Sequence, residues 1–248
     1  MPRRAPHRAP GQRAITPQGR GRFPGFDVLA SRDAWDDVTT GVVLGRLVPP
    51  VELAFFTPAE AAIAGPLLEA LLAQDGEPRV PVLALVDARL ADRETDGWHY
   101  DDMPEDADAW RETVGWLDAD ARAAHGRGRG FADLGAGEQA ALVQTVQDLA
   151  QDNKDWHRWP AARTWSLWTR YACTAFYSHP WAWNEIGFPG PAYPRGYVNP
   201  GVGGREHWEV ADHEDIDPVP FADRVAQARR DHRDLLTPAP APDADGGR

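Results

Sequence analysis

The segment spanning residues 165–197 constrains the fold more than any other part of the chain. Its first half repeats large apolar residues at helical spacing: Trp165, Trp168, Ala172, Ala175 and Phe176. This spacing is typical of the buried face of a helix. Pro180 should end the helix, because the residue before a proline is pushed out of the helical region. The pattern therefore predicts a buried central helix that runs into an irregular segment.

The irregular segment, residues 181–204, alternates glycine and proline with aromatic residues. Glycine and proline at this density argue against both a helix and a central strand. Because prolines restrict the backbone, we expect an ordered loop. Two interpretations of its aromatic residues are open. They form a rigid surface that contacts a partner protein, since such surfaces lose little entropy on binding, or they fold back over the protein's own core.

A second clear helix signal lies upstream. Thr57 and Glu60 form a capping box with Pro58 at the first helical position, which marks a helix start. The apolar spacing that follows predicts a helix that ends just before Gly76, since glycine is the usual residue after a helix end. Pro66 lies inside this helix and should kink it.

The remaining chain is read mainly from its apolar spacing. Further helices are predicted at residues 31–47, 81–90, 104–124, 136–150 and 220–236. A strand is the alternative for the first two ranges, because Thr39-Thr40 and Val42-Val43 favour a strand and residues 81–90 form a short apolar run. An acidic loop should occupy residues 92–105, and a turn should occupy residues 156–160. The fold class is therefore predicted to be all-α. One helical domain, residues 26–237, would carry the long ordered loop, between a disordered basic tail at 1–25 and a second disordered tail at 238–248.

Composition excludes some classes of partner. The formal net charge of −12 argues against nucleic-acid binding, and no run of eighteen apolar residues suggests a transmembrane helix. Arg3 and Arg4 are similar to the start of a twin-arginine export signal, but His7 and Arg8 interrupt the apolar stretch that such a signal needs. We therefore expect a cytoplasmic protein, or one that is periplasmic or exported as a complex if the true start lies upstream.

Two single residues carry specific expectations. Cys173 is the only cysteine, which rules out an intrachain disulfide and a cysteine-based zinc site. Its place in the apolar helix predicts a small buried side chain. His179 follows that helix directly, at the negative end of the helix dipole, which favours its protonated form.

Catalytic and metal sites find little support. The candidate metal ligands are His179, His207 and His213, with Asp212 or Glu214. Their spacing matches no compact metal-site template, so surface histidines are the alternative. The candidate carboxylates for glycoside chemistry are Glu185, Glu206, Glu209 and Asp212. Acidic residues are common enough here to arise in pairs by chance. No G-x-S-x-G or G-x-G-x-x-G motif occurs, so this chain is not expected to bind FAD, NAD or ATP.

The run YSHPWAWNEIGFPGPAYPRGY, residues 177–197, is similar to a motif of the gluconate 2-dehydrogenase subunit 3 family. Supporting marks are Phe55-Phe56-Thr57-Pro58-x-Glu60, Val86-Asp87-x-Arg89-Leu90, and Phe131 with Gln139. The order of elements resembles the family from about residue 51 to residue 197. The resemblance implies a mainly helical, non-catalytic small subunit. It would bind and stabilise a large FAD-dependent catalytic subunit of the glucose-methanol-choline oxidoreductase class, which oxidises a sugar, sugar acid or polyol.

The resemblance also implies where the partner binds. By match to the motif, the partner contacts would be His179, Trp181, Trp183, Asn184, Phe188, Pro189, Tyr193, Arg195 and Tyr197. It implies no catalytic residue, and the FAD would belong to the partner, with electrons passing in some members to a cytochrome subunit. Alternatives stay open: an assembly escort for the same flavoprotein, an independent carbohydrate-active enzyme, or a sugar-binding module.

Overall fold

The computed structural model describes residues 23, 26–48, 50, 52–74, 79–98, 100–126, 128–198, 201 and 205–210. The predicted helix at 220–236, the tail at 238–248 and almost all of the tail at 1–25 lie outside these residues, so they stay predictions, as do the domain boundaries. The regular elements are η1 (Val28–Ala34), α1 (Asp37–Gly45), α2 (Pro58–Leu72), α3 (Val82–Ala91), α4 (Asp106–His125), η2 (Phe131–Asp133), α5 (Ala136–Gln151), β1 (Asp155–Trp156), β2 (Trp159–Pro160), α6 (Ala161–Ser178) and α7 (Pro180–Ile186).

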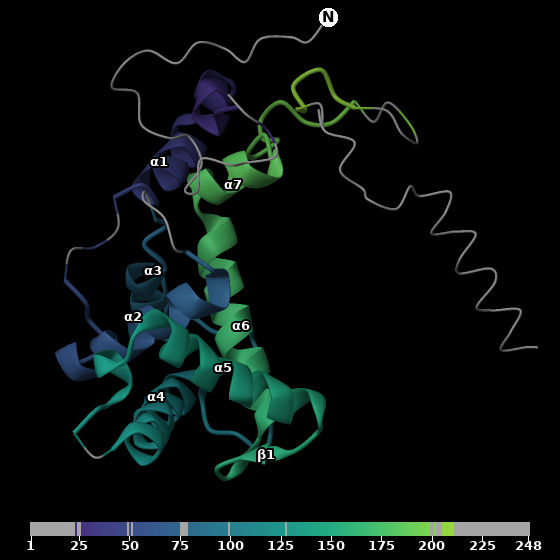
Figure 1. The fold of residues 1–248 in the computed structure, drawn as a ribbon. Helices are drawn as coiled ribbons and strands as arrows, with labels where there is room; N and C mark the ends of the chain where they lie inside the picture. The colour runs from purple at the N-terminus through teal and green to yellow at the C-terminus, as the bar shows by residue number, and fades with distance from the viewer. Residues whose placement is uncertain are drawn as a thin grey trace, which may run out of the picture. The chain divides into compact units, whose positions relative to one another are not determined.

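The prediction of an all-α fold is confirmed (Figure 1). Within the described residues, the only strands are β1 and β2, which form a short antiparallel hairpin where a turn was predicted. The described residues of the acidic segment 92–105 form a loop, as predicted. The helix predicted at 31–47 is split into the 3-10 helix η1 and the α-helix α1. No helix in the described residues is long and apolar enough to cross a membrane.

Helix α6 is the centre of the main core. It packs against α2, α3, α4 and α5, and Figure 1 shows it running from the β1 hairpin to α7. The predicted apolar stripe is confirmed: the buried members are Trp168, Ala172, Ala175 and Phe176, and Trp165 packs against them. Trp168 is fully buried, and its Nε1–H donates a 3.0 Å hydrogen bond to Oγ1 of Thr113 on α4. Burial of a large apolar side chain of this kind contributes about 1.5–3 kcal/mol.

Helix α2 begins as the sequence predicts. The Thr57 amide donates to Oε2 of Glu60 at 2.8 Å, and the Glu60 amide donates to Oγ1 of Thr57 at 3.3 Å, which completes the capping box. The helix ends earlier than predicted, at Leu72, because Ala73 takes a left-handed conformation with φ of 50°. Pro66 lies within the helix. The proposed end at Gly76 lies outside the described residues.

The prediction that residues 181–204 contain no helix is wrong for their first part. Pro180 occupies the first position of α7, where a missing N–H removes no helical hydrogen bond. His179 caps this helix, because its Nδ1 accepts the Trp181 amide at 3.2 Å. Gly187 ends it with a φ of 70°. Pro180, which the sequence indicated as the end of one helix, therefore also starts the next. The described residues after 187 form an irregular segment, as predicted.

A second, smaller core lies at the α7 end of α6. Its buried members are Val28, Trp35, Val43 and Trp183. They join η1 and α1 to α7, and Figure 1 shows α1 beside α7. Gly190, in the loop after α7, lies close against this core. A Cβ added at Gly190 would lie 2.5 Å from the Trp35 ring. Together with its φ of 83°, this explains why glycine is required at position 190.

Candidate docking surface

The large apolar side chains that remain exposed are concentrated in two segments. Among the described residues, all but one of them, Trp98, come from the α1 region or from the stretch that follows the middle of α6. The members are Val38, Val42, Leu44, Val48, Tyr177, Ile186, Phe188, Tyr193, Tyr197 and Val198. We call these ten residues the docking surface. The two segments belong to one part of the fold, because η1 and α1 pack against α7 and the loop that follows it.

The α1 half of this surface was not identified from the sequence. The helical spacing of Trp35, Val38 and Val42 favoured a helix over a strand, and Val38 and Val42 do lie on α1, whereas Trp35 follows the end of η1. In the structure Trp35 and Val43 are buried, whereas Val38 is 74% exposed and Val42 is 54% exposed. The reason is that α1 packs on α7 through only one side. In the sequence, Val42 and Val43 are adjacent, and a helix that packs through one face can bury only one of two adjacent residues.

The structure divides the nine predicted contact residues into three groups. Phe188, Tyr193 and Tyr197 are exposed. Trp181 and Arg195 are partly buried. The buried members are His179, Trp183, Asn184 and Pro189. The contact with a partner stays a prediction. Burial restricts direct contact to the members that are at least partly exposed, and the buried members help to build the surface.

The buried residues hold α7 in place through hydrogen bonds. Trp183 Nε1–H donates to the carbonyl oxygen of Tyr177 at 2.6 Å. Asn184 Oδ1 accepts the amide of Val28 at 2.7 Å. Nη1 of Arg46, at the end of α1, donates to the carbonyl oxygen of Ser178 at 3.0 Å. These bonds join α7 to η1 and to α6, and α1 to α6, so the exposed side chains project from a fixed backbone.

The loop after α7 is fixed in the same way. Nη2 of Arg195 donates to the carbonyl oxygens of Pro189 and Pro191, at 3.3 and 3.1 Å. Its guanidinium lies 4.1 Å from the ring centroid of Trp208, whose ring also contacts Tyr197. Burial lowers the pKa of Arg195. A loop ordered before binding loses less conformational entropy when a partner binds.

His179 does not carry the charge that its position suggested. Its side chain is 1% exposed, and burial, with a smaller contribution from Arg46, lowers its pKa to about 4. The prediction of a protonated His179 is wrong, because the dipole argument considered only the end of α6. The residue also caps α7, and Nδ1 must be unprotonated to accept the Trp181 amide.

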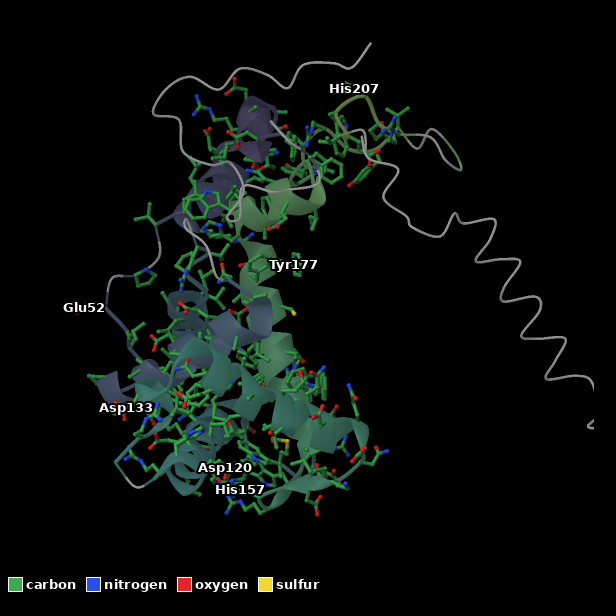
Figure 2. The ribbon with its side chains drawn as sticks, viewed as in Figure 1. Glu52, Asp120, Asp133, His157, Tyr177 and His207 are labelled. Atoms are coloured by element: carbon green, nitrogen blue, oxygen red, sulfur yellow. The ribbon has the colours of Figure 1, made fainter. Side chains whose placement is uncertain are left out.

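Cys173 is exposed, so the prediction that it is buried is wrong. It lies one helical turn after Thr169 and Arg170, on the side of α6 away from the buried stripe that contains Ala172. Figure 2 shows Tyr177, one turn further along α6, projecting outward from the helix. The helix is thus buried over a wide face but not all round.

The alternative chemistries gain no support from the described residues. In that part of the chain, no group of three or more His, Cys, Asp or Glu side chains could hold a metal ion. His213, Asp212 and Glu214 lie outside it. Glu185 is partly buried, and burial raises its pKa. The Glu206 amide donates to Oε2 of Glu209 at 2.8 Å, which places these two residues in one turn.

An aspartate–histidine pair occurs at the other end of α6. Asp120 accepts hydrogen bonds from Trp156 Nε1 at 2.8 Å and lies 3.0 Å from Nε2 of His157, and Figure 2 shows Asp120 and His157 together there. The His157 ring stacks on Trp116. The same carboxylate thus holds two hairpin residues against α4, which is a structural role that the sequence did not reveal.

Comparison with known proteins gives one match. No curated protein and no solved structure matches the chain. The family model for gluconate 2-dehydrogenase subunit 3 matches residues 58–190, more than half of the chain. The match runs from the first residue of α2 to the glycine that packs on Trp35, and η1 and α1 precede it. The helices of the main core, α7 and the start of the loop therefore all fall within the match, and the chain belongs to the gluconate 2-dehydrogenase subunit 3 family.

Proposed function

We propose that this chain is the non-catalytic accessory subunit of an FAD-dependent dehydrogenase that oxidises a sugar, sugar acid or polyol. In this proposal it binds and stabilises the large catalytic subunit through the docking surface. The observation that carries the proposal is the concentration of exposed large apolar side chains on α1 and on residues 177–198. A concentration of exposed large apolar side chains in one part of a fold is typical of an interaction site.

The composition of this surface suits a stable protein partner. Three of its members, Tyr177, Tyr193 and Tyr197, are tyrosines, which are over-represented among the residues that dominate binding energy. Burying one large apolar side chain contributes about 1.5–3 kcal/mol. The surface carries this apolar area on a backbone fixed by Arg195 and Asn184, so less of the gain is lost to ordering the chain on binding.

Family membership supplies the kind of partner. A subunit 3 belongs, by its name, to a dehydrogenase with other subunits, and in this proposal the FAD lies in the large one. This chain would therefore contribute no catalytic group and no cofactor ligand. The cytochrome partner and the cytoplasmic location stay predictions.

The test is a pull-down of the tagged chain from its native host, with an absorbance spectrum of the purified material. We expect a yellow complex with a large flavoprotein at a fixed ratio that persists at micromolar dilution. The variant Tyr193→Ala/Tyr197→Ala should lose most of the flavoprotein. Trp98→Ala is the matched control, because Trp98 is exposed but lies outside the docking surface.

Three outcomes would overturn parts of the proposal. A colourless monomer from the host would remove the subunit assignment altogether. If the flavoprotein dissociates on dilution, the chain would be an assembly escort that uses the same surface, and not a stable subunit. Equal capture by the double variant, with its fold intact by circular dichroism, would mean that the partner binds elsewhere.

A further inference from the structure

Glu185, near the end of α7, has a carboxylate oxygen that is buried without a partner. Within the described part of the chain, its Oε2 is the one buried carboxylate oxygen that makes no hydrogen bond. By contrast, the buried carboxylates of Asp87 and Asp106 each accept three hydrogen bonds. A buried polar group without a partner is rare in a native fold, so Glu185 is an exception that needs a physical reason.

The surroundings of Glu185 are unfavourable for a negative charge. It lies one helical turn after Trp181, and Ile186 and Phe188 of the docking surface follow it closely. It also lies in the last turn of α7, where the helix dipole disfavours a carboxylate and favours a cation. Burial raises the pKa of Glu185, and among the described residues no hydrogen bond or positive charge opposes this shift. A cation beside the carboxylate would relieve each of these costs.

The arginines that lie near α7 are engaged with other groups. Nη1 of Arg46 donates to the carbonyl oxygen of Ser178 at 3.0 Å. Nη2 of Arg195 donates to two proline carbonyl oxygens of its own loop, at 3.3 and 3.1 Å. Neither arginine contributes to the pKa of Glu185. The described residues therefore supply no cation for this carboxylate.

Docking of a partner would make the position of Glu185 less favourable unless the partner brings a positive charge. Ile186 is 49% exposed and Phe188 is 37% exposed, so a protein that packs on them would also remove water from the partly exposed Glu185. A carboxylate that loses its water without gaining a cation is costly to bury. A neutral hydrogen-bond donor would satisfy the oxygen but leave the charge uncompensated.

We propose that Glu185 is the charged anchor of the docking surface and pairs with an arginine or lysine side chain of the large catalytic subunit. This inference rests on the proposed function, because it assumes that this subunit binds the docking surface. It adds the chemistry of the contact, which is an apolar area of the partner that carries a positive charge. A partner without that charge would bury the carboxylate unpaired, so Glu185 would also select against wrong partners.

The first test uses the full chain without its partner and compares Glu185→Gln with the parent. Glutamine keeps the shape of the side chain and removes a charge that nothing compensates. We expect the melting temperature of the variant to equal that of the parent or to exceed it by up to about 4 °C. Glu94→Gln is the matched control, because Glu94 is exposed and lies outside the docking surface, and it should melt as the parent does.

The second test is capture of the flavoprotein from the native host by the tagged variants, followed by a dilution series of each complex. Glu185→Gln should weaken the complex by at least about tenfold, as expected for the loss of one close charge pair at an interface. Glu185→Arg should abolish capture, and Glu94→Gln should bind as the parent does. Added salt should weaken the parent complex more than the Glu185→Gln complex, because salt screens the charge pair.

Equal affinity of Glu185→Gln and the parent for the flavoprotein would overturn the inference, as would equal weakening of both complexes by salt. A melting temperature of Glu185→Gln more than about 2 °C below that of the parent would also overturn it, since the carboxylate would then stabilise the chain's own fold.

Failure of this inference can be told apart from failure of the proposed function. If Glu185→Gln captures the flavoprotein as the parent does while Tyr193→Ala/Tyr197→Ala does not, the proposed function stands and the charged anchor is wrong. If the parent itself captures no flavoprotein, the proposed function fails and this inference fails with it.

Discussion

The amide of Val28 donates a 2.7 Å hydrogen bond to Oδ1 of Asn184, joining residues that are 156 positions apart. Val28 is fully buried and Asn184 is 2% exposed. The bond links η1, which precedes the family match, to α7, which lies within it. The two halves of the docking surface are held together by this contact and by the small core around Trp183.

Replacing Asn184 should loosen the N-terminal part of the fold. Asn184→Ala leaves the Val28 amide buried without its acceptor, which costs about 1–3 kcal/mol. Hydrogen exchange should rise in residues 26–48 and change little in α2 to α5, because these helices belong to the other core. An equal increase in hydrogen exchange across the whole chain would contradict this division into two cores.

Substitutions at two neighbouring valines on α1 distinguish an effect on partner binding from an effect on folding. Val42 is 54% exposed and Val43 is 1% exposed. Val42→Asp should leave the melting temperature within about 2 °C, since surface substitutions rarely shift stability by more than about 0.5 kcal/mol. It should reduce capture of the flavoprotein, because Val42 belongs to the docking surface. Val43→Asp places a carboxylate in the small core and should destabilise α1 strongly. If both variants melt alike, the assigned faces of α1 are wrong.

The free energy of unfolding should decrease as the pH is lowered, over a range set by the pKa of His179. Its pKa is about 4 in the fold, against an ordinary value of 6.5. Above pH 6.5 the residue is neutral in both states, so its stabilising contribution is complete. As the pH falls from 6.5 to about 4, only the unfolded chain takes up the proton, and up to about 3 kcal/mol is lost.

The measurement for His179 is urea unfolding of the parent and of His179→Asn across that pH range. Asparagine is a good helix cap and does not titrate, so the variant should lose less stability on acidification. Carboxylates that titrate in the same range act in both proteins, and the difference between the two curves isolates His179. Parallel curves would show that His179 does not control this dependence.

Asp87 should be one of the most sensitive positions of the main core. Its carboxylate is 2% exposed and accepts the amides of Ala54, Phe55 and Phe56 at 2.6 to 3.0 Å. Asp87→Ala leaves these amides without an acceptor and should cost at least about 3 kcal/mol. We expect calorimetry to show a melting temperature about 6–12 °C lower. The control, Asp92→Ala, replaces an exposed carboxylate and should melt as the parent does.

Much of the fold follows from local sequence. The capping box of Thr57 and Glu60, the apolar spacing of α6 and the turn before it could all be predicted, because each depends on residues a few positions apart. The end of α2 could not, since the left-handed Ala73 replaces the glycine that the pattern led us to expect. The loop also began with a helix, because Pro180 serves both as a stop and as a start.

The sequence by itself determined that the chain is helical, where its central helix lies and which family it resembles. Only the tertiary structure decided that Val43 and not Val42 is buried, that Cys173 is exposed, and that His179 is neutral. Local patterns fix a helix and its apolar positions, because hydrogen bonds and side-chain spacing act over a few residues. Which of those positions is buried, and which groups carry charge, depends on packing between segments far apart in the chain, as between Val28 and Asn184.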